Sequence, residues 1–256
     1  MFSAVGRWTI AGARFAGSST LLLAESGSYL FRGKLRALLT LRHIAQIGFD
    51  SLPISCLTLL FGGMVLSLHT VKLFMRFGAS EYVGGMVGVS IARELGPVLT
   101  SVVVAARVGS AMAAELGTMK VTEQIDALRA MATSPAEYLV LPRVLATACA
   151  LPLLTLYTEA CGVVGALAVA AWQGVTSREF FASMARFLEP SDFFGGLLKT
   201  VVFGVIVALV GCRQGLQTTG GAAGVGRATT SSVVISISLI YGSNYLLSWL
   251  ILTLWP

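Results

Sequence analysis

The sequence predicts an all-α integral membrane protein with about five transmembrane helices. Of its 256 residues, 55% are hydrophobic and only 12% are charged, and the mean hydropathy is +0.82. Soluble domains average about 25% charged residues, so lipid must be the main solvent of this chain. Five apolar segments are long enough to cross a bilayer core, which takes roughly 20 residues each. These spans fall at about 51–71, 82–111, 144–171, 193–211 and 233–254.

Residues 1–48 precede the first span and are basic and moderately apolar. Leu38, Leu39 and Ile44 stand beside Arg36 and Arg42. This combination favours a helix that lies in the cytoplasmic interface of the membrane. An ordinary positively charged flank of the first span is the alternative. We therefore divide the chain into an interfacial region at 1–48 and a transmembrane domain at 49–256.

The distribution of Lys and Arg predicts the orientation in the membrane. Residues 1–50, 112–143 and 212–230 together carry 11 of them, whereas 72–81, 172–192 and the tail carry 4. Basic residues favour the cytoplasm. The N-terminus is therefore expected inside, the C-terminus outside, and 112–143 in the cytoplasm. The net charge of +6 follows from this orientation and does not indicate nucleic-acid binding.

Motifs for catalysis, metals or nucleotides are missing from the sequence. The four cysteines form no CxxC pair, which argues against a zinc site or a disulfide framework. The glycine-rich stretch 220–230 lacks the GK[ST] of a phosphate-binding loop, so we expect a flexible cytoplasmic turn there. The chain is therefore not expected to be an enzyme or to hold a cofactor or metal.

Small residues recur every four positions in the second span. Gly84, Gly88, Ala92 and Gly96 form one such series, and a second covers 105–117. This spacing lets helix backbones approach closely in lipid. The contact could lie within one bundle or between subunits, and the sequence does not decide.

Arg93 and Glu94 lie near the middle of the second span. At 1.5 Å per residue they are about 16–18 Å below Tyr82. A charge at that depth costs at least about 2.5–3.5 kcal/mol and therefore marks a cavity or a partner. Gly96-Pro97 follows at once and predicts a kink. We interpret the pair as part of a substrate path, with a structural ion pair as the alternative.

Three further polar residues lie in other spans. Lys199 is within snorkelling reach of the outer face, whereas Glu159 is deeper in the third span. Both are candidates for function because ionisable residues in membranes are costly. His69, near the outer end of the first span, is more typical of a hydrogen-bonded interfacial residue.

The cytoplasmic segment 115–131 is expected to form a short amphipathic helix. Val121, Ile125 and Leu128 recur at helical spacing, Glu123 and Asp126 take the other side, and a proline at 135 ends the run. Such a helix could cap the bundle or serve as a handle for a soluble partner.

The run ARELGPVLTSVVVAARVGSAMAAELGTMKVTEQIDALRAM, at 92–131, resembles the signature region of MlaE-type (YrbE-type) permeases. FGGMVLSL at 61–68, LPRVLA at 141–146, LLKTVVFG at 197–204 and GVGRATT at 224–230 add to the resemblance. It covers nearly all of the chain after about residue 40.

This resemblance implies the permease subunit of an ABC transporter that moves lipids, typically phospholipids, between the inner and outer membranes of bacteria. The implied partners are a second copy of the chain, a cytoplasmic ABC ATPase that binds ATP and Mg, an MCE protein outside the inner membrane and a small STAS-type regulatory subunit. The permease itself would be non-catalytic.

The resemblance also assigns residues to roles. The implied lipid-binding residues are Leu66, His69, Arg93, Glu94, Lys199 and Arg227. The implied ATPase-coupling residues, within 115–131, are Glu115, Lys120, Glu123, Gln124 and Asp126. The sequence departs from the family pattern at His69, commonly Gln, at Asn244, often Asp, at Ala223, commonly Glu, and at Ala106, usually Gly, which leaves the identity of the lipid open.

Two other classes of protein remain possible from the sequence. An ion- or proton-coupled secondary transporter would use Glu94, Glu159 and His69 as a relay and would work without an ATPase. A non-transporting membrane scaffold would tolerate apolar replacement of the charges within the membrane.

Overall fold

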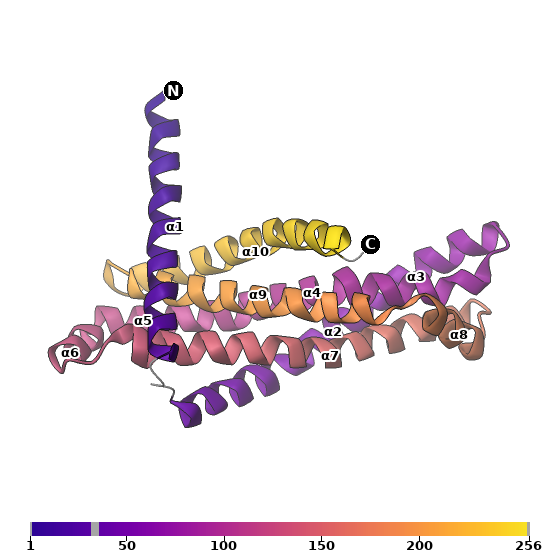
Figure 1. Cartoon of the computed structure of the whole chain (residues 1–256), viewed down its shortest axis with the longest axis horizontal. Coiled ribbons are helices and arrows are strands. Elements are labelled where there is room, and N and C mark those ends of the chain that lie inside the picture. The colour runs from indigo at the N-terminus through magenta and orange to yellow at the C-terminus, as the bar shows by residue number, and fades with distance from the viewer. Residues whose placement is uncertain (1, 32–35, 255–256) are drawn as a thin grey trace.

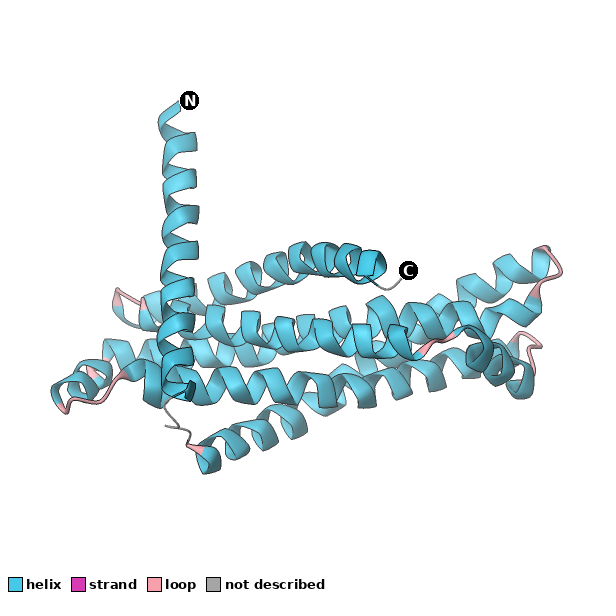
Figure 2. Cartoon of the chain, in the orientation of Figure 1, coloured by secondary structure: helices cyan, strands magenta, loops and turns pink. Residues whose placement is uncertain are grey.

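The computed structural model describes residues 2–31 and 36–254, and in these two ranges all regular secondary structure is helical (Figure 2). Five helical stretches there are long and apolar enough to cross a membrane, which confirms the predicted all-α class and the five spans. They are Ala37–Arg76, Ser80–Val121, Ala136–Trp172, Pro190–Leu216 and Gly221–Thr253.

Each predicted span lies within a longer helix or helical stretch. The first is part of α2 (Ala37–Arg76), and the third, fourth and fifth are parts of α7 (Leu141–Trp172), α9 (Pro190–Leu216) and α10 (Gly221–Leu254). The second comprises α3 (Val83–Ser90), η2 (Ile91–Leu95), α4 (Gly96–Val104), η3 (Ala105–Gly109) and α5 (Ser110–Val121), preceded by η1 (Ser80–Tyr82). The short elements α6 (Gln124–Ala130), η4 (Ala136–Val140) and α8 (Ser177–Phe187) lie between spans.

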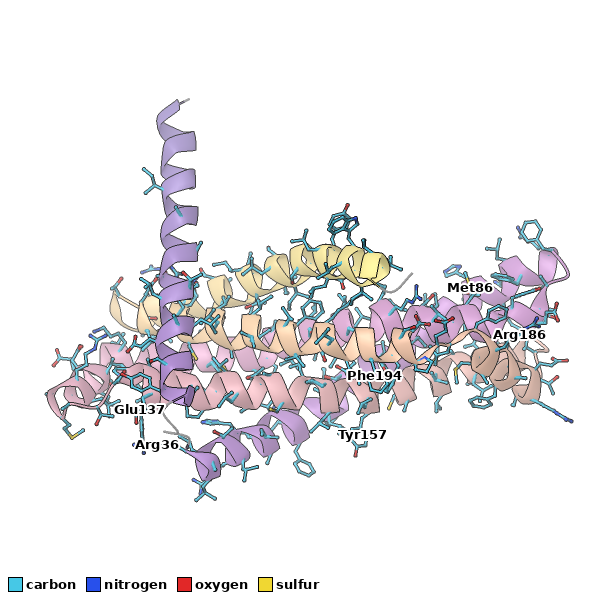
Figure 3. All side chains as sticks on the ribbon, viewed as in Figure 1. Arg36, Met86, Glu137, Tyr157, Arg186 and Phe194 are labelled. Carbon is cyan, nitrogen blue, oxygen red and sulfur yellow. The ribbon has the colours of Figure 1, made fainter. Side chains whose placement is uncertain are left out.

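The spans run along the long axis of the molecule, with α6 at one end and α8 at the other (Figure 1). We call these the α6 end and the α8 end. Arg36 and Glu137 lie at the α6 end and Arg186 lies at the α8 end (Figure 3). Between the ends, exposed aromatic side chains such as Tyr157 and Phe194 project from the bundle. Charged ends and an apolar middle are what a spanning bundle requires.

Helix α1 (Phe2–Phe31) runs across the bundle near the α6 end instead of along it (Figure 1). It contacts α7, α9 and η4. Helix α2 begins at Ala37 and passes without a break through the boundary expected between residues 48 and 49. Residues 37–48 therefore belong to the same helix as the first span, while residues 1 and 32–35 of the expected interfacial region lie outside the described residues.

The small residues of the second span pack against other helices of the same chain. A Cβ atom on Gly84 would lie 2.0 Å from the carbonyl oxygen of Phe180 in α8. One on Gly96 would lie 2.5 Å from the Glu159 side chain in α7. At these positions glycine permits close packing within one bundle.

The segment 115–131 is two helices and not the single amphipathic helix that we expected. Helix α5 ends at Val121, and α6 begins at Gln124 after a turn in which Glu123 has a left-handed φ of 61°. As a result Ile125 is fully buried whereas Val121 is exposed, so the two do not share one face. A left-handed residue cannot continue a right-handed helix, and for this reason the helical periodicity misled the prediction.

The glycine-rich stretch is mostly helix. Helix α10 begins at Gly221, and the preceding Gly220 has a φ of 87° that glycine adopts without strain. The flexible turn expected over 220–230 is therefore wrong beyond its first residue.

Candidate functional site

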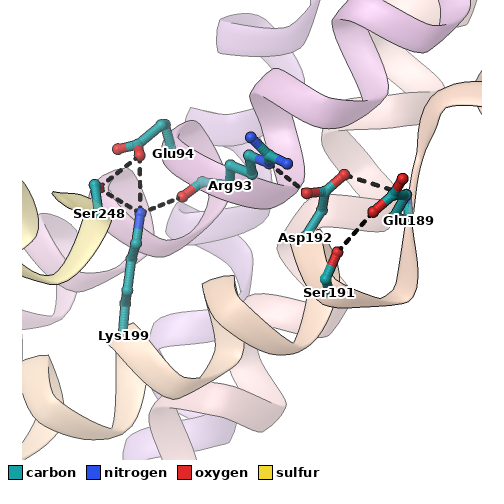
Figure 4. A network of polar contacts seen from close by, with 7 residues as sticks. All are labelled: Arg93, Glu94, Glu189, Ser191, Asp192, Lys199 and Ser248. Carbon is teal, nitrogen blue, oxygen red and sulfur yellow. Dashed lines mark hydrogen bonds and ion pairs between the residues drawn. The ribbon is translucent and has the colours of Figure 1, made fainter. Parts of the chain in front are cut away.

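A polar cavity of about 250 Å³ lies where η2, α9 and α10 meet (Figure 4). Its charged lining comes from residues far apart in sequence, and the remainder is small or apolar. The lining residues are Arg93, Glu94, Asp192, Lys199 and Ser248, together with Ser191, Gly195, Gly196, Ile251 and Leu252.

The backbone at the cavity departs from α-helical geometry. Arg93 and Glu94 lie in the π-helical turn η2, directly before Gly96-Pro97, where the sequence predicts a kink. Pro97 has no N–H to donate to the carbonyl four residues back, which belongs to Arg93. The Lys199 Nζ donates to that carbonyl oxygen at 2.8 Å instead. The proline therefore creates an acceptor that a side chain from α9 satisfies.

Lys199 is turned into the protein and does not snorkel outward as expected. Its side chain is only 4% exposed. Besides the Arg93 carbonyl, Nζ donates at 2.8 Å to Glu94 Oε1 and at 2.8 Å to Ser248 Oγ. An ammonium group has three N–H bonds. All three are used within the chain, so Lys199 positions other residues and has no free donor for a ligand.

Glu94 receives hydrogen bonds from two helices. Its Oε1 accepts from Lys199 and from Ser248 Oγ, and its Oε2 accepts from Asn244 Nδ2 at 2.7 Å. The side chain remains 45% exposed. An amide at position 244 can donate to the carboxylate, whereas an Asp there would repel it unless protonated.

Arg93 pairs with Asp192, and not with Glu94. The Arg93 Nε donates to Asp192 Oδ1, while the buried Asp192 also accepts the Glu189 N–H at 3.1 Å through Oδ2. Glu189 and Asp192 form the capping box that begins α9. Sequence reasoning missed Asp192, although a proline at the first helical position followed by an acidic residue in the first turn is a known signal for a helix start.

The guanidinium of Arg93 is the cation that the site leaves available. Its Nε is used by Asp192, but its terminal nitrogens carry four further N–H bonds and the side chain is 42% exposed. Arg93 also lines a second, adjacent cavity of about 570 Å³, with Phe187 and Leu252 among its lining. A group that can donate several parallel hydrogen bonds beside apolar walls suits a phosphate attached to hydrocarbon.

The other residues implied for lipid binding lie elsewhere. Leu66 packs with the core cluster that includes Leu59 and Phe180, and His69 is exposed on α2. Arg227 is at the α6 end of α10, about 25 Å along the helix from Asn244 at 1.5 Å per residue. Of the six residues implied for lipid binding, the structure therefore brings together only Arg93, Glu94 and Lys199.

The residues implied for coupling surround the turn between α5 and α6. Lys120 Nζ lies 2.8 Å from Asp126 Oδ2, and this hydrogen bond holds the pKa of Asp126 below its usual range. Gln124 Nε2 donates to Thr122 in the same turn, where Glu123 is exposed. Glu115 is separate, because its Oε2 accepts from Arg143 Nη2 at 3.0 Å.

Glu159 is buried in α7 beside Gly96. Within the described part of the chain its carboxyl group forms no hydrogen bond or ion pair. It is therefore separate from the network around Glu94.

A multi-pass helical bundle with ion-paired charge around a cavity in its spans is typical of a membrane transport protein. The chain belongs to the MlaE permease family, whose model, described as Permease MlaE, matches residues 40–250. A probable ABC transporter permease protein of Synechocystis is 44% identical over 223 residues, which cover 87% of this chain and 85% of the relative.

Two further relatives extend the comparison. A probable ABC transporter permease protein of Rickettsia felis is 43% identical over 247 residues, which cover 96% of this chain and 95% of the relative. The chloroplastic protein Trigalactosyldiacylglycerol 1 of Arabidopsis thaliana is 42% identical over 220 residues, 86% of this chain and 63% of that protein. The chain is therefore a membrane permease subunit of the ABC transporter type.

Proposed function

We propose that this permease moves lipids, in particular phospholipids, between the inner and outer membranes of a bacterium. It acts as a homodimer with a cytoplasmic ABC ATPase that binds ATP and Mg, with an MCE protein on the periplasmic side and with a small STAS-type subunit. The name of the plant relative contains a lipid, which supports the substrate class.

The available guanidinium of Arg93 is the observation that carries the proposal. It lies within a span and lines two cavities, and both cavities include Leu252, which shares an exposed apolar face of α10 with Tyr245 and Trp249. A phospholipid needs a donor for its phosphate and apolar surface for its acyl chains. Arg93 provides the first, and the α10 face provides the second.

The proposed orientation places the α6 end in the cytoplasm, with the N-terminus inside and the C-terminus periplasmic. The excess of Lys and Arg in the connections at the α6 end supports this orientation. The ATPase then contacts α6 and the turn before it. The MCE protein lies beyond the α8 end.

The proposed mechanism joins the two ends through the second span. Closure of the ATPase pushes the α5–α6 turn, and α5 continues through η3 and α4 to the η2 turn that carries Arg93. π-Helical turns are frequent at functional sites. Movement at η2 changes the exposure of Arg93 and releases or accepts the lipid phosphate.

Lipid transfer in a reconstituted system tests the proposal. The permease, its ATPase and its MCE protein are placed in proteoliposomes, and transfer of a fluorescent phospholipid is measured with and without ATP. Arg93→Ala and Glu94→Ala should each reduce ATP-dependent transfer at least about tenfold, the loss expected for one charge-assisted hydrogen bond. Arg178→Ala, at an exposed position on α8, is the matched control. Unchanged transfer in both site variants would refute the proposed role.

The secondary-transporter alternative receives less support. Its relay requires Glu94, Glu159 and His69 to communicate, but Glu94 is held by Lys199 and His69 is exposed on α2. Replacing both Glu123 and Asp126 by their amides separates the two classes. The change should uncouple an ABC permease from its ATPase, whereas a secondary transporter should continue to work.

A further inference from the structure

A third cavity lies at the α6 end, where α2, η3, α5 and α7 meet. Its volume is about 190 Å³. It is separate from the Arg93 cavity and shares none of its lining. The polar residues of its wall are His43, Gln46, Asp50, Arg107, Glu115 and Arg143.

Two ion pairs form the charged wall of this cavity. Arg107 Nη2 lies 3.4 Å from Asp50 Oδ2, and Arg143 Nη2 lies 3.0 Å from Glu115 Oε2. Arg143 is buried and also donates to the Leu139 carbonyl. The side chains of Arg107, Asp50 and Glu115 are each about half exposed. One cation and two carboxylates therefore face the opening.

The hydrogen-bond donors and acceptors of this wall suit a ligand that carries both a negative and a positive group. Arg107 uses Nη1 for Ser51 and Nη2 for Asp50, and its guanidinium has five N–H bonds in all. The remaining donors can bind a phosphodiester. The exposed oxygens of Asp50 and Glu115 can accept from an ammonium group, which a phosphate alone would not use.

The backbone at Arg107 repeats the pattern at Arg93. Arg107 lies in the π-helical turn η3, as Arg93 lies in η2. The two arginines are about 21 Å apart along the second span at 1.5 Å per residue. In the proposed orientation, Arg93 is within the membrane and Arg107 is at the level of the cytoplasmic headgroups.

An exposed apolar strip continues from the cavity along α2. Ile54, Leu57, Phe61 and Val65 follow Asp50 at intervals of three or four residues, so they share its face of the helix. Each is more than half exposed. The strip runs away from the α6 end, in the direction that acyl chains take from a headgroup at the membrane surface.

We propose that this cavity binds the headgroup of a phospholipid that carries a phosphodiester and a primary ammonium, with its acyl chains along the strip from Ile54 to Val65. Arg107 binds the phosphate, and Asp50 and Glu115 accept from the ammonium. The inference rests on the proposed membrane orientation but not on the role of Arg93. It gives the chain a second lipid site, at the cytoplasmic leaflet.

Photo-crosslinking from position 46 tests the site. A photoreactive amino acid replaces Gln46, which lines the cavity, and the permease is placed in nanodiscs of equal phosphatidylethanolamine and phosphatidylglycerol. The expected result is about a tenfold excess of phosphatidylethanolamine adducts, the preference that one charge-assisted hydrogen bond provides. Asp50→Asn should reduce this preference, Arg107→Gln should reduce both adducts, and Arg107→Lys should restore part of the yield.

Arg178→Gln is the control, and it should not change the adducts at position 46. If Arg93→Ala loses lipid transfer, but the permease with the photoreactive residue at position 46 and no other change gives no lipid adducts, only this second site is refuted. Equal yields of the two lipids, or yields unaffected by Arg107→Gln, would show ordinary annular lipid. A crosslink between two copies of the chain, without lipid adducts, would show that a second protomer covers the cavity and would refute the lipid site. If size-exclusion chromatography shows that Arg107→Gln does not fold, the test depends on two other results. These are the ratio of phosphatidylethanolamine to phosphatidylglycerol adducts with Arg107 intact, and the change in that ratio in Asp50→Asn.

Discussion

Replacing Lys199 by Met tests whether this buried ammonium positions the candidate site. The change keeps the length of the side chain but removes the donors to the Arg93 carbonyl, Glu94 and Ser248, each at 2.8 Å. Breaking a buried ion pair costs about 3–5 kcal/mol. Water can reach Glu94, which is 45% exposed, and replaces part of the interaction. We therefore expect a loss of about 2 kcal/mol, or about 4–8 °C in melting temperature.

The assay is thermal unfolding of the detergent-purified permease, followed by intrinsic fluorescence. Lys72→Met, at an exposed position on α2, is the matched control and should change stability by less than about 0.5 kcal/mol. Glu94→Gln and the double variant complete a thermodynamic cycle. The structure predicts a coupling energy of at least about 1 kcal/mol. Additive losses in the double variant would contradict the ion pair, and a neutral Lys199→Met would show that Lys199 does not hold the site together.

Three more predictions concern other parts of the chain. Gly84→Leu should displace α8, since a Cβ there would lie 2.0 Å from an α8 carbonyl oxygen, and faster proteolysis around α8 would reveal the loss. Asp192→Asn should weaken the ion pair with Arg93 and lower the melting temperature by about 2–4 °C for each kcal/mol lost, whereas an unchanged value would argue against the pair. The Lys120 hydrogen bond holds the pKa of Asp126 below its ordinary 3.8, so its contribution to the α5–α6 turn is present above that pH and is lost as the pH falls through the lowered value. The protection factors of the turn amides, which correct for the intrinsic pH dependence of hydrogen exchange, should be insensitive to pH near neutrality and fall in strong acid, and Asp126→Asn should lower them at neutral pH.

The number and order of the spans could be predicted because lipid imposes one requirement along the whole chain. Every backbone N–H and C=O within the membrane must be bonded, so a long apolar run must be a helix. Hydropathy does not locate helix ends, however. Helix α2 begins at Ala37 and α10 begins at Gly221, well before their apolar runs, because helices continue outside lipid wherever neighbouring elements pack on them.

The candidate site could be predicted only in part. The cost of charge in lipid identified Arg93, Glu94 and Lys199 one at a time. Their partners depend on contacts between distant segments, since Asp192 is 99 residues from Arg93 and Asn244 is 150 residues from Glu94. Sequence spacing carries no information about such pairs. The left-handed Glu123, which divides 115–131 into two helices, is likewise set by its surroundings and not by periodicity.

Native mass spectrometry of the gently solubilised complex tests the central claim most directly. The account predicts two copies of this chain together with two ATPase subunits and bound phospholipid, and fewer bound phospholipids in Arg93→Ala. A lone chain without a nucleotide-binding partner, under conditions that preserve other transporters of this type, would contradict it.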